Sequence, residues 1–213
     1  MLRKRKKFRF LRFDGLYTKE KAVVVFTFFY IFLFSALSFS KGNREFIFYS
    51  ITMLLLLLLG IYVNRQVKLP ELTILGLSTL GLLHILGGNV VIRNTRLYDT
   101  FFVFDIFRYD NIVHVFGTLL ATFVLNTLFF GFSRDTSNIR LGLYYFSLVL
   151  MALGVGVFNE IVEFLAVLFF NSEEGVGGYL NNAVDLIYNL IGALVAVIFI
   201  DTYRVYKNTH SKN

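Results

Sequence analysis

The 213-residue chain has no cysteine, no tryptophan and a single proline, Pro70. Without cysteine, the protein has no disulfide bond, no thiolate nucleophile and no sulfur ligand for zinc. With only one proline, long helices are largely unbroken. Charged residues are also scarce, at 16% of the chain against 56% hydrophobic residues, and the mean hydropathy is +0.66. This composition is too apolar for an ordinary soluble domain and indicates several membrane spans.

Hydrophobic runs of about 20 residues predict membrane-spanning helices. The chain has six such runs, so we expect an all-α polytopic membrane protein built as a bundle of six transmembrane helices. The predicted spans cover approximately residues 22–40, 46–63, 71–92, 111–131, 141–170 and 182–202. We expect one transmembrane domain over residues 22–202, with a basic cytoplasmic arm before it (1–21) and a cytoplasmic tail after it (203–213).

Positive charge is distributed unevenly between the two sides of the predicted spans. Sixteen of the 21 Lys and Arg residues fall on one side, nine of them before the first span. Because cytoplasmic loops are enriched in Lys and Arg, we expect both termini in the cytoplasm and the protein in the cell (inner or plasma) membrane. Aromatic residues interleave the N-terminal basic residues, which favours contact with anionic lipid over nucleic-acid binding. We expect membrane lipids as partners and no nucleic acid, and the sequence leaves the oligomeric state open.

Ionisable residues within the last four hydrophobic segments are the main functional signal. They are His84, Asp110, His114, Glu160, Glu163 and Asp185. Each would cost roughly 2.5–3.5 kcal/mol if it faced lipid at mid-bilayer, so we expect them to face one another, water or a ligand. In the expected orientation all of them lie in the outer half of the membrane, and several are three or four residues apart on one helix face. The sequence therefore predicts a polar chamber in the outer half of the bundle.

The chemistry of this chamber has three possible interpretations. Excess carboxylates in a low dielectric take up protons or hold a cation, and imidazole together with carboxylate suits zinc, iron or manganese. A divalent metal site, an acid–base or ligand-binding cluster and a purely structural ion-pair network all stay open. The candidate catalytic residues are Glu160, Glu163, His114 and Asp110. The candidate metal ligands are His84, His114, Asp110 and Glu160.

Four motifs carry a family resemblance. They are LLHILGGN (82–89), RYDNIVHVFG (108–117), FNEIVEF (158–164) and AVDLIYNLIGA (183–193). Together they resemble the YjdF-type inner-membrane proteins and, more distantly, the VanZ-like proteins. Asn111 follows Asp110 where VanZ-like proteins have a lysine, and Glu163 stands where they have a glutamine. The resemblance to the YjdF-type branch implies no established activity, and antibiotic resistance is not inferred. The motifs contain the candidate substrate-binding residues Arg108, Tyr109, Asn89, Asn159, Asp185 and Asn189.

The depth of the cluster favours a protein that binds or hydrolyses the headgroup of a lipid or other amphiphile. Glu160 or Glu163 would act as general base on water and His114 as acid, while His84 and Asp110 orient groups or hold a metal. A proton- or ion-coupled small-molecule transporter and a non-catalytic scaffold are the alternatives. The transporter is less favoured, because the inner halves of the spans are nearly all apolar and neither broken helices nor inverted repeats are evident.

The charge distribution makes topology the first testable prediction. A reporter fused after Lys212 should report the cytoplasm, and a reporter inserted within residues 173–178 should report the exterior, because the positive-inside rule fixes both. A C-terminus found outside would contradict the shared depth of the ionisable residues in the outer half.

Overall fold

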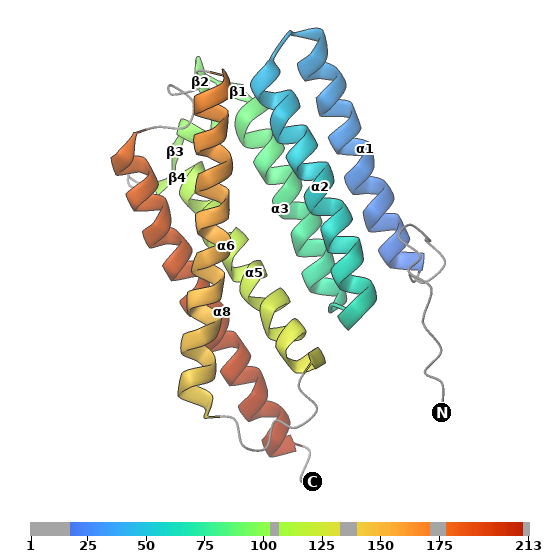
Figure 1. Cartoon of the computed structure of the whole chain (residues 1–213), viewed down its shortest axis with the longest axis vertical. Coiled ribbons are helices and arrows are strands. Elements are labelled where there is room, and N and C mark those ends of the chain that lie inside the picture. Colours follow the sequence, from blue (N-terminus) through green and yellow to red (C-terminus); the bar gives the residue numbers. More distant parts are fainter. Residues whose placement is uncertain (1–17, 103–106, 133–139, 171–177, 211–213) are drawn as a thin grey trace.

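The computed structural model describes residues 18–102, 107–132, 140–170 and 178–210. These residues form long helices with short hairpins at one end of the bundle (Figure 1). The long helices are α1 (Thr18–Ser40), α2 (Arg44–Val67), α3 (Glu71–Asn89), α5 (Tyr109–Phe132), α6 (Leu141–Phe170) and α8 (Tyr179–His210). All six of these described helices are long and apolar enough to cross a membrane, which confirms the predicted all-α polytopic class.

The third helix is shorter than its predicted span. We expected the span to reach residue 92, but α3 ends at Asn89 and a hairpin of β1 (Val91–Ile92) and β2 (Thr95–Arg96) follows. The two turn residues, Arg93 and Asn94, have φ angles of 49° and 69°. Positive φ at both positions gives a two-residue turn the twist that antiparallel strands require. Hydropathy alone cannot separate such a short apolar strand from the end of a helix.

The rest of the connection between α3 and α5 contains a short 3-10 helix and a second hairpin. The helix η2 covers Leu97–Asp99, and β3 (Phe101–Phe102) pairs antiparallel with β4 (Phe107–Arg108). At the other end of the chain, α8 continues through His210, so the described part of the expected tail is helical. The hairpins and η2 lie at the end of the bundle opposite the start of α1 and the end of α8 (Figure 1).

The helices pack as two groups of three. One group consists of α1, α2 and α3, the other of α5, α6 and α8, and contacts between α3 and α5 join them. In the second group, glycine allows close approach at two crossings. A Cβ added at Gly192 of α8 would collide with the backbone carbonyl oxygen of Val115 on α5, and one added at Gly156 of α6 would lie 2.6 Å from Asn189 Nδ2 on α8. Small residues at these crossings bring the polar faces of the three helices together.

Gly192→Ala should destabilise the fold by about 1–3 kcal/mol, because a backbone oxygen cannot move aside as a flexible side chain can. Gly154→Ala, on α6, is the matched control, since a Cβ there meets nothing within 4 Å. Thermal unfolding in detergent, followed by intrinsic tyrosine fluorescence, should show a lower Tm for Gly192→Ala only. Equal Tm values for both variants would contradict the close crossing of α5 and α8.

Candidate functional site

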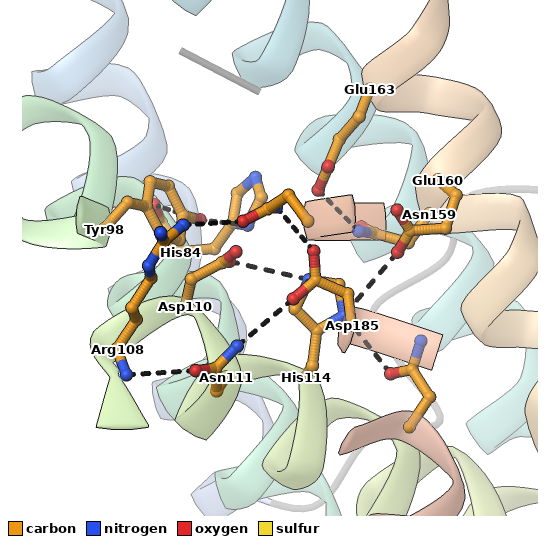
Figure 2. Close-up of polar contacts among 12 residues, drawn as sticks. His84, Tyr98, Arg108, Asp110, Asn111, His114, Asn159, Glu160, Glu163 and Asp185 are labelled. Atoms are coloured by element: carbon orange, nitrogen blue, oxygen red, sulfur yellow. Dashed lines mark hydrogen bonds and ion pairs between the residues drawn. The ribbon is translucent and has the colours of Figure 1, made fainter. Parts of the chain in front are cut away.

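The centre of the site is formed by Asp110 and His114 of α5 and Asp185 of α8. Each offers one potential metal-ligating atom, and these atoms all lie within 4.8 Å of one another (Figure 2). His114 Nε2 is 3.5 Å from Asp110 Oδ1 and 3.8 Å from Asp185 Oδ1. His114 and Asp185 are buried, and Asp110 is partly buried. Two acids and an imidazole from two helices therefore converge on one small volume inside the bundle.

The other ring nitrogen of His114 identifies its tautomer. Nδ1 lies 3.2 Å from Oδ1 of Asn189, an amide oxygen that can only accept a hydrogen bond. Nδ1 therefore carries a hydrogen and donates it, and in the neutral ring Nε2 presents a lone pair to the two carboxylates. Distances of 3.5 and 3.8 Å are too long for hydrogen bonds. They are close to the separation of about 3.4 Å between two ligands of one tetrahedral ion with bonds of about 2.1 Å.

Side-chain amides hold Asp185 in place. Asn111 Nδ2 donates to Asp185 Oδ1 at 3.3 Å, and Asn181 Nδ2 donates to Asp185 Oδ2 at 2.7 Å. Arg108 secures both amides, because its backbone N–H donates to Asn111 Oδ1 at 3.0 Å and its Nη1 donates to Asn181 Oδ1 at 2.8 Å. Both oxygens of Asp185 thus keep a fixed direction, with lone pairs left for a further partner.

Two glutamates of α6 add further negative charge. Glu160 Oε1 is 3.7 Å from His114 Nδ1, and neither carboxylate oxygen of the buried Glu160 has a hydrogen-bond partner among the described residues. Glu163 Oε1 accepts a hydrogen bond from Asn159 Nδ2 at 2.7 Å. Four carboxyl groups therefore surround one imidazole (Figure 2).

A cavity of about 30 Å³ adjoins this cluster on the side of the hairpins. Its walls come from α2, α3, β2, η2, α5 and α6. The lining residues are Glu45, Phe46, Tyr49, His84, Arg96, Tyr98, Asp110 and Glu163. Since Asp110 and Glu163 belong to both the cluster and the cavity wall, a molecule in the cavity would be in direct contact with the cluster.

His84 lies at the cavity wall, outside the central group, and Tyr98 of η2 fixes its ring. The Tyr98 hydroxyl is 3.0 Å from the carbonyl oxygen of His84 and 2.5 Å from His84 Nδ1. Burial raises the pKa of Tyr98 well above its usual range, so the phenol keeps its proton. Because the carbonyl can only accept, the hydroxyl donates to it, and Nδ1–H of His84 donates to the phenol oxygen. Nε2 of His84 is left as an acceptor.

The structure brings most of the predicted site residues together, but the group that could hold a metal ion is not the predicted set of four ligands. Of the four candidate metal ligands, Asp110 and His114 are in the central group, where Asp185 joins them. Two candidate substrate-binding residues make contacts with the backbone of α3 instead: Asn89 Nδ2 donates to the carbonyl of Ile85, and the Tyr109 hydroxyl donates to that of Leu83, both at 2.9 Å.

The candidate site residues from the sequence did not include Tyr98, Asn111 or Asn181, and Asn111 was noted only as a difference from VanZ-like proteins. Asn181 and Asp185 are four residues apart, and this helical spacing was the one signal that could have found Asn181. Nothing in the hydropathy pattern marks Tyr98 or Asn111.

A family model described as "Predicted membrane protein (DUF2238)" matches residues 22–206. The chain belongs to this family. The match extends over the six long helices and the whole cluster, and the description agrees with a multi-pass membrane protein. Comparisons with curated proteins and with solved structures gave no significant match.

In this DUF2238 protein a row of polar side chains continues along α5 from the cluster, away from the hairpins. Thr118 and Thr122 follow His114 at four-residue intervals on α5, and both are buried. Their hydroxyls donate to the carbonyl oxygens of His114 and Thr118, at 2.5 and 2.7 Å. Asn126, one further turn along, accepts a hydrogen bond from the Tyr144 hydroxyl at 2.7 Å. This face of α5 is therefore polar over more than its hairpin end, and in the expected orientation the row would enter the half that we expected to be nearly apolar.

Glu160→Gln should leave the Tm in detergent at or above that of the wild type. The substitution keeps the shape of the side chain and removes one negative charge from a set with too few cations. If Glu160 were instead one partner of a structural ion pair, its loss should cost about 3–5 kcal/mol. Tyrosine fluorescence during thermal unfolding distinguishes the two outcomes.

Asp185→Asn is the contrasting variant at the same cluster. Asn111 and Asn181 each donate to one oxygen of Asp185, and the amide of the variant replaces one of these oxygens with an NH2 group. One buried donor would then lose its acceptor, which destabilises the fold by about 1–3 kcal/mol. A lower Tm is expected for this variant only.

Proposed function

We propose that this DUF2238 protein is a membrane-embedded, divalent-metal-dependent hydrolase that acts on the headgroup of a lipid or other amphiphile. The observation that carries the proposal is the position of His114 Nε2, which faces two carboxylate oxygens at 3.5 and 3.8 Å. With both termini in the cytoplasm of a YjdF-type inner-membrane protein, the hairpins and the cavity lie on the outer side of the cell (inner or plasma) membrane.

The donor set suits a borderline or hard divalent ion. Asp110, His114 and Asp185 offer one imidazole nitrogen and carboxylate oxygens, which fits zinc, manganese or iron, and the sequence contains no cysteine thiolate. Asn189 accepts from the other ring nitrogen of His114, while the amide of Asn181 holds Asp185. Outer hydrogen bonds of this kind orient the ligands of metal centres.

The residues beside the metal ligands suit hydrolysis of an ester or phosphodiester. A bound divalent ion would lower the pKa of a water molecule and polarise the substrate oxygen. Glu163, at the boundary between cluster and cavity, accepts a proton from the attacking water and passes it to the leaving oxygen. The products are a hydroxyl group and an acid, so that water is added across the broken bond. Asn159 holds Glu163 in position for both transfers.

Metal content and turnover can be measured separately. Purified wild-type protein should hold about one equivalent of zinc, manganese or iron by elemental mass spectrometry, and His114→Gln should lose it. His84→Gln is the matched control and should keep the metal, because Tyr98 holds His84 outside the central group. Glu163→Gln should also keep the metal, yet release headgroups from lipid roughly 10²–10⁴-fold more slowly. Wild-type protein that holds no metal after incubation with each ion would contradict the proposal.

One observation favours a second candidate, a proton- or ion-coupled transporter. The row of buried Thr118, buried Thr122 and partly buried Asn126 extends the polar face of α5 beyond the cluster, toward the cytoplasmic end of the expected topology. Membrane carboxylates with such a continuation are typical of proton relays. A proton flux into reconstituted vesicles that is lost in the isosteric Thr122→Val variant would support the transporter over the hydrolase.

A further inference from the structure

The cavity beside the cluster carries more negative than positive charge. Three carboxylates and one guanidinium line it, and the guanidinium of Arg96 is already paired, since its Nη1 lies 3.6 Å from Glu45 Oε1. A divalent ion in the cluster would balance Asp110 and Asp185. Glu163 in the cavity wall would still lack a cation, because its hydrogen-bond partner Asn159 is a neutral amide, and a carboxylate in these apolar surroundings favours a cation.

Aromatic rings form another part of the same wall. Tyr49 and Tyr98 flank His84 edge-on, with ring centroids 5.8 and 5.6 Å from the imidazole. Aromatic rings next to carboxylates are typical of ammonium-binding sites, because the ring quadrupole attracts a positive charge. A phosphate in the same position would face Glu163 and Asp110 at close range.

The volume of the cavity restricts the size of the cation. About 10–15 Å³ on this measure holds one water molecule, so a cavity of about 30 Å³ has room for a primary ammonium group and an adjoining methylene. A trimethylammonium group adds three methyl groups to the same nitrogen and is too large. Size and charge together select a primary amine.

Positive charge lies outside the cavity, on neighbouring residues of the same end of the bundle. Arg44 precedes the lining residue Glu45, and Arg93 occupies the turn of the β1–β2 hairpin, and both are exposed. Arg96 is itself about one-third exposed. A phosphate attached to the bound amine through a short linker would meet these guanidinium groups on leaving the cavity.

We infer that the cavity binds the primary ammonium group of a phosphoethanolamine headgroup, with the lipid phosphatidylethanolamine as its source. Glu163 and Glu45 face the ammonium group, Tyr49 and Tyr98 cover it, and the guanidinium groups outside bind the phosphate. This inference goes beyond the proposed function: the bound ammonium group lies beside the cluster and the phosphate lies outside the cavity, so the pose is one of headgroup recognition and requires no turnover.

A series of dioleoyl lipids tests the inference on the full chain in detergent by native mass spectrometry. The series runs from phosphatidylethanolamine through its monomethyl and dimethyl forms to phosphatidylcholine, with phosphatidylglycerol as a lipid without an amine. The affinity should fall with each methyl group, to about one-tenth or less for phosphatidylcholine, and phosphatidylglycerol should bind equally weakly. Equal binding across the series, or a preference for phosphatidylglycerol, would overturn the inference. Competition by soluble O-phosphoethanolamine without binding of the lipid would overturn the lipid source and leave the ammonium site.

Glu45→Gln tests the same site without altering the metal ligands. It should reduce the preference for phosphatidylethanolamine several-fold and leave the metal content unchanged, because Glu45 lines the cavity and lies outside the metal-binding group. Glu71→Gln is the matched control, since Glu71 is an exposed residue at the start of α3 that pairs with Lys19. An unchanged lipid preference in Glu45→Gln would contradict the inferred contact between Glu45 and the ammonium group. Selective lipid binding by a protein without metal would disprove the proposed hydrolase and leave the inference standing.

Discussion

Carboxylates in a low-dielectric interior must be balanced by a cation, a proton or hydrogen-bond donors, and this requirement explains most of the polar architecture of the bundle. Asp185 is balanced by two side-chain amides, and Glu163 by one. Neither carboxylate oxygen of Glu160 has a hydrogen-bond partner among the described residues, and the imidazole of His114 lies 3.7 Å from Glu160 Oε1. The fixed cation Arg108 directs its side chain to Asn181 and the ring of Phe101. Within the part of the chain that the structure describes, the donors around the cluster are therefore too few for its acids.

The surrounding hydrogen bonds also prevent His114 and the aspartates from moving together to form direct hydrogen bonds with one another. Asp185 would need to leave Asn111 or Asn181 to reach His114, and His114 would need to leave Asn189 to turn toward another acid. A direct hydrogen bond between the imidazole and either aspartate would shorten a contact of 3.5 or 3.8 Å. A bound ion requires its ligands to be held at a fixed separation by neighbouring residues, and these hydrogen bonds hold Asp185 and His114 in that way.

Hydropathy and charge predicted the helices, and helical spacing predicted which polar residues share a face, because both signals repeat along the sequence. The hairpins of residues 91–108 were missed because two-residue strands are too short for a periodic pattern. Depth in the membrane grouped His84 with Asp110 and His114, yet depth does not fix the rotation of a helix about its axis. The packing of α5 against α8 selects Asp185 for the central group, and the sequence contains no direct record of that packing.

The cluster differs in its connections toward the two ends of the bundle, and this asymmetry favours headgroup chemistry over transport. Toward the hairpins, Asp110 and Glu163 open into a cavity. In the other direction, the hydroxyl of Thr122 donates to a carbonyl of its own helix, and the hydroxyl of Thr118 is shared between the carbonyl of His114 and Oδ1 of Asn189. Fully buried Leu148, together with alanines of α6 and α8, fills the described interior of the same three helices. This packed interior lies along the row, whereas a headgroup reaches the cluster through the cavity that this conformation already contains.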